Sequence, residues 1–173
     1  MVATFISLGN STRCQVCPAG FFCPNPAVLP IPCASGTYTS AGAVECTPCP
    51  IGFQCPYNAT QLIVQCPAGT YANETGQELC ILCPEGHECR TASQQPSLCH
   101  RGTYSSGGLS SCIPCPNGYF MNYTGAVECD ICPAGSACPV ARNRPTVCPA
   151  GMYRFDSYNF SKYSLIFCSF TVL

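Results

Sequence analysis

Cysteine spacing constrains this chain more than any other feature of its sequence. The chain holds 19 Cys among 173 residues, a fraction typical of disulfide scaffolds. A C-x-x-G segment recurs nine times, at steps of 16 or 17 residues, and such a fixed period indicates a repeat architecture. The segments begin at Cys17, Cys33, Cys49, Cys66, Cys83, Cys99, Cys115, Cys132 and Cys148.

Each unit contains one further cysteine, whose position separates short units from long ones. It follows the first cysteine by six residues in short units, by 13 or 14 in long units and by 20 in the last unit. Two long units follow one another at Cys99 and Cys115. If disulfides joined neighbouring units, this doubled long unit would leave cysteines without partners. We therefore predict that each unit closes its own loop, although spacing alone leaves other connectivities open. The predicted pairs are Cys17–Cys23, Cys33–Cys46, Cys49–Cys55, Cys66–Cys80, Cys83–Cys89, Cys99–Cys112, Cys115–Cys129, Cys132–Cys138 and Cys148–Cys168.

These disulfides would replace a thin aliphatic core. Leu, Ile, Val and Phe together supply only 35 of 173 residues, too few for a large core. In the chain-entropy description, closing a loop of about 14 residues constrains the unfolded state by roughly 3 kcal/mol. Several such loops could offset the missing apolar burial.

The remaining cysteine, Cys14, is predicted to be unpaired in this chain. Extending the repeat back from Cys17 places the first cysteine of another long unit just before Met1. The segment Met1–Asn10 also lacks the features of a secretory leader. We therefore expect a fragment of a longer ectodomain or a misplaced gene start, with a free or intermolecular Cys14 as the alternative.

Asparagine positions favour an oxidising, extracellular compartment, as the cysteines do. Five of the eight Asn begin an N-x-S/T acceptor, where chance would place about one. Shared use of Asn, Ser and Thr in turns is the alternative reading. The predicted N-glycosylation sites are Asn10, Asn58, Asn73, Asn122 and Asn159.

Other repeated residues predict local structure. Most units read C-P-x-G, which predicts a tight turn with Pro at its second position and Gly at its fourth. Long units then carry an aromatic residue in a predicted short strand, its ring packed on the disulfide. No helical periodicity is long enough to predict a helix. The aromatic residues are Tyr38, Tyr71, Tyr104, Phe120 and Tyr153.

The repeat predicts a domain division and a C-terminal departure from it. The apolar end at 165–173 could be part of a truncated membrane helix or foreign read-through sequence, and it is too short to span a bilayer. The predicted division is 1–16, the end of a truncated long unit; 17–48, 49–82 and 83–114, each a short and a long unit; 115–131, an extra long unit; 132–155, an incomplete repeat; and 156–173, a non-repeat apolar tail.

Two segments resemble a known family. CPAGTYANETGQELCILCPEG at 66–86 and CHRGTYSSGGLSSCIPCPNG at 99–118 are similar to the cysteine-rich repeat of ephrin-type receptor tyrosine kinases, and to growth-factor-receptor and tumour-necrosis-factor-receptor cysteine-rich relatives. The resemblance implies a small disulfide-rich fold, an elongated tandem array of short β-hairpin and turn modules with little or no helix. It implies spacer or protein-binding use in receptors and large surface proteins. The short units depart from the ephrin-receptor form, and no catalytic residue is carried over.

A zinc protein is the first alternative, because five C-x-x-C pairs have the knuckle spacing of zinc sites. In the tiling, however, each pair only joins the end of one loop to the start of the next. The pairs are Cys14/Cys17, Cys46/Cys49, Cys80/Cys83, Cys112/Cys115 and Cys129/Cys132.

An enzyme is the second alternative. A thiol oxidoreductase needs one activated C-x-x-C at a helix N-terminus, and here the motif recurs between turns. The two His, His87 and His100, are expected in turns or at the surface, and acids such as Glu85 and Glu88 form no repeated pair. We therefore expect no catalytic residue, no metal site and no cofactor, and the few acids also argue against calcium.

The expected function is a non-enzymatic extracellular segment of a larger protein, acting as a spacer, adhesion or protein-interaction array. A receptor-type ligand-binding ectodomain is the alternative. Partners would be a protein ligand or neighbouring repeats, with no small-molecule substrate and membrane contact only through a missing anchor. With 7 basic and 8 acidic residues, no basic surface for nucleic acid is expected. Candidate recognition residues, for which packing onto the neighbouring layer is the alternative, are Val28, Leu29, Ile31, Leu62, Ile63 and Val64.

Overall fold

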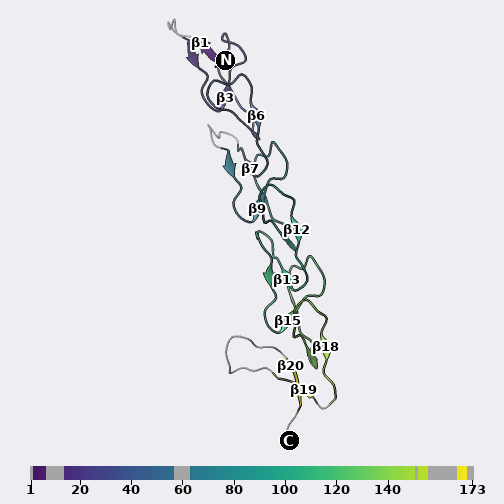
Figure 1. The fold of residues 1–173 in the computed structure, drawn as a ribbon. Coiled ribbons are helices and arrows are strands. Elements are labelled where there is room, and N and C mark those ends of the chain that lie inside the picture. Colours follow the sequence, from purple (N-terminus) through teal and green to yellow (C-terminus); the bar gives the residue numbers. More distant parts are fainter. Residues whose placement is uncertain (1, 7–13, 57–62, 151, 156–166, 171–173) are drawn as a thin grey trace. The chain divides into compact units, whose positions relative to one another are not determined.

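The computed structural model describes residues 2–6, 14–56, 63–150, 152–155 and 167–170 (Figure 1). In these ranges the chain contains no helix, and its short strands pair into ten two-stranded sheets. Every pair is antiparallel. The chain is therefore a small disulfide-rich array of tandem hairpins, as the resemblance implies.

Each hairpin joins two strands that follow one another in the sequence. The pairs are β1 (Thr4–Ile6) with β2 (Cys14–Val16), β3 (Phe21–Phe22) with β4 (Ile31–Pro32), β5 (Thr37–Tyr38) with β6 (Thr47–Pro48), β7 (Phe53–Gln54) with β8 (Val64–Gln65), β9 (Thr70–Tyr71) with β10 (Ile81–Leu82), β11 (His87–Glu88) with β12 (Ser97–Leu98), β13 (Thr103–Tyr104) with β14 (Ile113–Pro114), β15 (Tyr119–Phe120) with β16 (Asp130–Ile131), β17 (Ser136–Ala137) with β18 (Thr146–Val147), and β19 (Met152–Phe155) with β20 (Phe167–Phe170).

One hairpin corresponds to one C-x-x-G unit. In the unit that begins at Cys33, β5 starts immediately after Gly36 and β6 ends immediately before Cys49. The backbone N–H of Cys49 then donates a 2.8 Å hydrogen bond to the carbonyl of Gly36. Six further units close in the same way, so the end of each hairpin is tied to its own first turn.

The first turn differs from the prediction by one residue. The N–H of Phe53 donates to the carbonyl of Pro50, so Pro is the first residue of the turn and Gly52 the third. Gly52 has a φ of 81°, and a type II turn requires such a positive φ at its third residue. The predicted placement at the second and fourth positions is therefore wrong, because the turn begins after the cysteine.

Threonine supports this turn in three long units. The Oγ1 hydroxyl of Thr70 donates to the carbonyl of Pro67 at 2.8 Å, the same carbonyl that accepts the N–H of Thr70. Thr37 and Thr103 make equivalent bonds to Ala34 and His100. The recurring T-Y sequence thus caps the turn and starts the first strand.

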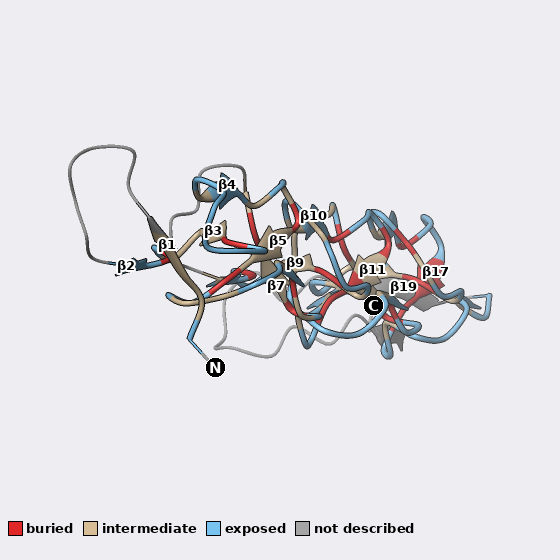
Figure 2. Cartoon of the chain, turned by 90° about the horizontal axis from the view of Figure 1, so that it is seen from above, coloured by how far each residue is buried: buried red, intermediate tan, exposed pale blue. Residues whose placement is uncertain are grey.

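Cystine sulfurs and small residues form most of the described core. Cys17, Cys49, Cys55 and Cys99 have no exposed surface, and the largest other side chain buried as completely is Met121. Figure 2 shows second strands such as β4 and β10 as exposed. Covalent links and turns thus occupy the interior, and the second strand of each hairpin from β2 to β18 is exposed.

Backbone hydrogen bonds join each unit to the next. The N–H of Gly42 donates to the carbonyl of Cys17 at 2.8 Å, and the N–H of Cys23 donates to the carbonyl of Ala43 at 3.0 Å. Gly108 and Cys83 repeat the first of these bonds at 2.7 Å. The loop of a long unit therefore packs against the disulfide-closed loop of the short unit before it.

The chain divides into two compact units, Met1–Leu82 with Thr91–Gln95, and Cys83–Arg90 with Pro96–Leu173. In the second unit, residues 167–170 of the predicted non-repeat tail pair with 152–155, with Arg154 opposite Cys168. Within the residues that the structure describes, no helix could span a bilayer.

Candidate functional site

Disulfides close the loops on which the other side chains of the array are carried. The structure brings together the two cysteines of eight predicted pairs, with Cα atoms 5.7–6.0 Å apart, within the normal range for disulfides. Cys148 is also disulfide-bonded, while the side chain of its predicted partner Cys168 lies outside the described residues. Cys14 is free and exposed.

The C-x-x-C pairs do not act as single sites in this arrangement. Cys46 bonds back to Cys33, whereas Cys49 bonds forward to Cys55. A sulfur in a disulfide offers no thiolate to a metal or a substrate. Among the described side chains, no group of three or more His, Cys, Asp or Glu is placed to hold a metal ion.

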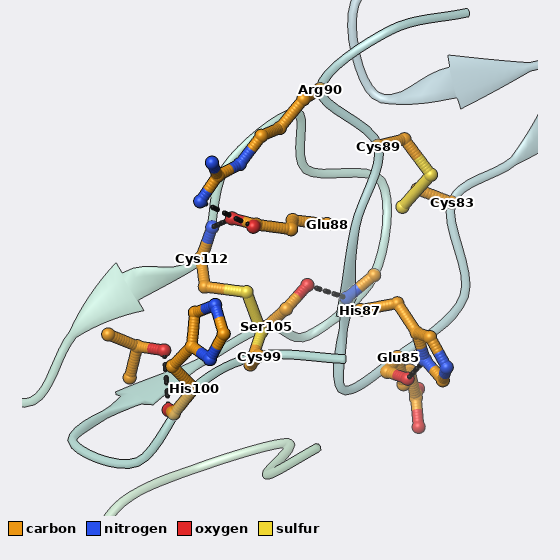
Figure 3. The surroundings of a disulfide bond; sticks show 12 residues. Cys83, Glu85, His87, Glu88, Cys89, Arg90, Cys99, His100, Ser105 and Cys112 are labelled. Atoms are coloured by element: carbon orange, nitrogen blue, oxygen red, sulfur yellow. Dashed lines mark hydrogen bonds and ion pairs between the residues drawn. A yellow bond between two sulfur atoms is a disulfide. The ribbon is translucent and has the colours of Figure 1, made fainter. Parts of the chain in front are cut away.

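Within the second compact unit, a buried carboxylate links two neighbouring repeats (Figure 3). Glu88 lies on β11 and is 4% exposed. Its Oε2 accepts a 3.1 Å hydrogen bond from the backbone N–H of Cys112, and its Oε1 lies 2.7 Å from Nη2 of Arg90. Glu88 therefore connects a short unit to the cysteine that closes the following long unit.

The surroundings of Glu88 favour its charged form. Burial alone raises the pKa of this carboxyl, because it penalises the charge. The hydrogen bond from Cys112, the ion pair with Arg90 and the nearby His100 act in the opposite direction and leave the pKa below its ordinary value. Glu88 is therefore an ionised acceptor at neutral pH.

Gln54 occupies the equivalent position in the first compact unit. It lies five residues after Cys49, as Glu88 lies five residues after Cys83. Its Oε1 accepts a 2.9 Å hydrogen bond from the N–H of Cys80. The sequence identifies Glu88 only as a scattered acid. The other two short units carry Phe22 and Ala137 at this position, so the repeat pattern does not reveal the acceptor.

The two histidines make local contacts. Nδ1 of His87 lies 2.8 Å from the carbonyl of Glu85, within the same turn. The carbonyl of His100 accepts the N–H of Thr103, at 3.1 Å. His100 is exposed and begins its turn, whereas His87 is partly buried as the first residue of β11.

Aliphatic side chains recur on the exposed second strands. Leu82, Ile131 and Val147 are 66%, 68% and 76% exposed. Among the predicted recognition residues, Val28, Leu29, Ile31 and Val64 are exposed and Ile63 is partly buried, whereas Leu62 lies outside the described residues. Eight of the nine second strands from β2 to β18 carry an exposed aliphatic residue, at Val16, Ile31, Val64, Ile81, Leu82, Leu98, Ile113, Ile131 and Val147.

Two predicted glycosylation sites can be placed. Asn73 and Asn122 are partly exposed, and each lies seven residues after the first cysteine of a long unit. Asn10, Asn58 and Asn159 lie outside the described residues. The aromatic residues Tyr38, Tyr71, Tyr104 and Phe120 lie on first strands and are partly buried, and their predicted packing on the disulfides stays a prediction.

Closed cysteine loops, tandem hairpins and an outward-facing strand define an extracellular disulfide-rich repeat module. Residues 102–142 match the family described as tyrosine-protein kinase ephrin type A/B receptor-like. The chain therefore contains an ephrin-receptor-like cysteine-rich repeat, an extracellular, receptor-type module of a non-catalytic family. No curated protein matches the chain.

Proposed function

We propose that this chain acts as an adhesion or protein-interaction array within a larger extracellular protein. The cysteine loops are the scaffold, with the nine predicted pairs as their connectivity, and the second strands are the contact surface. Ephrin-receptor-like ectodomain modules generally mediate protein interactions. This general role is consistent with the proposal.

The recurrence of exposed aliphatic residues on the second strands carries this proposal. A single exposed Leu or Ile is common on soluble proteins and needs no explanation. Here an aliphatic residue returns in nearly every hairpin, always on the strand that leads into the next unit. Protein contacts use apolar side chains that are left exposed in the free molecule.

Receptor-type ligand binding is the second candidate function. The family match at 102–142 favours it, because that description refers to receptors. It differs from adhesion in its partner, which would be a soluble protein rather than a surface. Asn73 and Asn122 are proposed to carry glycans that restrict which faces remain accessible.

A bead-adhesion assay tests the proposal. Beads coated with the secreted chain are mixed with each other and with adherent cells, and attachment is counted. The test variant is Leu82→Thr/Ile131→Thr/Val147→Thr, since Thr keeps strand propensity while removing apolar surface. The matched control is Val44→Thr/Leu79→Thr/Val127→Thr, which changes exposed aliphatic residues outside the strands.

We expect attachment by the wild type and the control, and a loss of at least fivefold in the strand variant. If the control loses attachment equally, adhesion depends on exposed apolar surface in general, and the second strands are not the specific contact surface. If neither beads nor cells attach to the wild type, the array is a spacer and the proposed interaction role is wrong.

A further inference from the structure

Three arginines and two asparagines line one hollow in the second compact unit. The cavity has a volume of about 340 Å³ and is lined by Arg101, Asn122, Arg142, Asn143 and Arg144. The five residues come from three successive repeat units, those that begin at Cys99, Cys115 and Cys132. The cavity is near the lower end of the usual size range of ligand sites, roughly 300–1,000 Å³.

A ladder of backbone hydrogen bonds holds these segments together. The N–H of Gly102 donates to the carbonyl of Met121 at 2.8 Å, and the N–H of Met121 donates to the carbonyl of Ala141 at 2.7 Å. Arg101, Asn122 and Arg142 are direct chain neighbours of these three residues. Their backbones are therefore positioned by the fold, independently of any ligand.

A close contact also fixes Arg142 against the first turn. Gly102 has a φ of 82°, and a Cβ at this position would lie 3.0 Å from the backbone nitrogen of Arg142. Only a residue without a side chain allows the loop at 140–144 to approach the turn this closely. The cavity is thus a defined feature of the repeat geometry.

Among the described residues, the structure gives these arginines no carboxylate partner. Only seven Lys and Arg occur in the whole chain, and three of the Arg meet at this cavity. The ion pair found among the described residues joins Arg90 to Glu88, away from these three arginines. No Asp or Glu is found among the described residues that line the cavity, so these lining residues offer the arginines no counter-charge.

The first compact unit provides an internal comparison. There the N–H of Gly52 donates to Ala72 and the N–H of Ala72 donates to Ala92, both at 2.7 Å, which repeats the ladder. A Cβ at Gly52 would face Ser93 where one at Gly102 faces Arg142. The positions equivalent to the cavity residues are Ile51, Asn73, Ser93, Gln94 and Gln95.

The comparison shows that the repeat forms this ladder without arginine. Asn73 keeps the asparagine of Asn122, but none of the three arginines has a charged counterpart. The scaffold therefore does not need the positive charges for its own stability. Their convergence in one place requires a separate reason.

We propose that this cavity binds an anionic saccharide, through a sulfate or carboxylate group held by Arg101, Arg142 and Arg144. Guanidinium groups match such oxyanions with paired N–H donors. The carboxamides of Asn122 and Asn143 both donate and accept hydrogen bonds, which suits sugar hydroxyls. This site is independent of the exposed second strands, so it goes beyond the adhesion function proposed above.

The predicted glycan on Asn122 would compete with such a ligand, because Asn122 lines the cavity. Thr124→Ala removes the N-x-T acceptor and keeps the Asn122 side chain. Every protein in the test therefore carries Thr124→Ala. Binding is then measured on a cavity that no attached sugar can fill.

The test measures binding of four probes by calorimetry at low ionic strength. The probes are a heparin-derived tetrasaccharide, the same tetrasaccharide without its sulfates, a hyaluronan tetrasaccharide and a tetraglutamate peptide. The sulfate-free probe and the hyaluronan probe retain only carboxylates, so they distinguish the two sources of negative charge. The peptide represents an acidic protein segment.

Three proteins are compared. The first is the Thr124→Ala chain, and the second adds Arg101→Gln/Arg142→Gln/Arg144→Gln. The third adds Thr75→Ala and Ile51→Arg/Ser93→Arg/Gln95→Arg to that second protein, which removes the N-x-T acceptor at Asn73 and restores the net charge at the equivalent site of the first compact unit. The three altered arginines are exposed, so their replacement leaves the disulfide scaffold intact, and a disulfide map of each protein verifies this.

We expect one or more of the saccharides to bind, the glutamine variant to lose at least tenfold in affinity, and the transplanted arginines to restore part of it. Affinity should fall with added salt, because ionic contacts are screened. The proposal is overturned if no saccharide binds, if the glutamine variant binds within twofold of its parent, or if the peptide binds more tightly than every saccharide. Loss of bead adhesion in the strand variant with intact saccharide binding would separate this site from the adhesion surface.

Discussion

The backbone N–H of Cys112 donates a 3.1 Å hydrogen bond to Oε2 of Glu88, a buried carboxylate in the preceding unit. Gln54 accepts the N–H of Cys80 in the same way, at 2.9 Å. In both compact units, a side chain of a short unit thus satisfies the amide of the cysteine that closes the next loop. This contact couples neighbouring units without a covalent bond between them.

Removing the acceptor at Glu88 should loosen the next loop. Glu88→Ala leaves the partly buried Cys112 N–H without its partner, which costs about 1 kcal/mol, the lower end of the range for a buried donor. Glu88→Gln keeps an acceptor but makes it neutral, as Gln54 is at the equivalent position of the first compact unit. We expect hydrogen exchange at the Cys112 amide to be at least tenfold faster in Glu88→Ala than in Glu88→Gln.

Gln54→Ala is the matched control for this experiment. It should accelerate exchange at Cys80, its own partner, and leave Cys112 unchanged. Equal exchange at Cys112 in the wild type and in Glu88→Ala would show that the carboxylate does not hold the loop.

The charge of Glu88 should make stability depend on pH. Its folded-state pKa is lowered, so its stabilisation is fully present above the ordinary carboxyl pKa of about 4.3. It is lost as the pH falls through the lowered pKa. The melting temperature of the wild type should therefore exceed that of Glu88→Gln at pH 6, and the difference should shrink toward pH 3.

The ion pair with Arg90 limits the size of this effect. Arg90 is 66% exposed, and exposed pairs contribute at most about 1 kcal/mol. Arg90→Gln should therefore lower the melting temperature less than Glu88→Ala does. A pH-independent difference between the wild type and Glu88→Gln would contradict the role assigned to the charge.

Gly86→Ala should be among the most destabilising small substitutions. Gly86 has a φ of 69°, and a Cβ there would collide with the carbonyl of Gly125, in the unit two further along the chain. Gly135→Ala is the control, because its φ is 75° but nothing lies within 4 Å of the added Cβ. The control carries only the backbone strain of about 1 kcal/mol.

We expect Gly86→Ala to lower the free energy of unfolding by at least 1 kcal/mol more than Gly135→Ala, measured by denaturant unfolding of the oxidised proteins. Equal effects of the two substitutions would mean that units two apart do not pack at this glycine.

Deleting one short loop should leave the other loops intact. Cys49→Ala/Cys55→Ala removes a disulfide whose loop constrains the unfolded state by roughly 2 kcal/mol. Because each unit closes itself, mass mapping should find the remaining pairs unchanged and no new free thiol beyond Cys14. Reshuffled pairs in this variant would show that the units depend on one another for pairing.

The hairpin repeat could be predicted from the sequence because its causes are local. The spacing of Cys33 and Cys46 and the C-x-x-G turn act within one unit of 16 residues, so no distant contact is needed to recognise them. The exception was the turn itself, because the pattern does not reveal whether it begins at the cysteine or at the following proline.

Contacts between units could not be predicted in the same way. The partner of Glu88 is 24 residues away, and the approach of Gly86 to Gly125 joins units two apart. The composition also indicated no basic surface, yet Arg101 and Arg142 meet at one cavity. Net charge is a sum over the chain and carries no information about where side chains gather.

Non-reducing peptide mapping of the secreted chain tests the central claim, that each unit closes its own loop. We predict nine pairs, each within one unit, including Cys148–Cys168, and a free thiol at Cys14 alone. Disulfides between different units, or many free thiols, would contradict it.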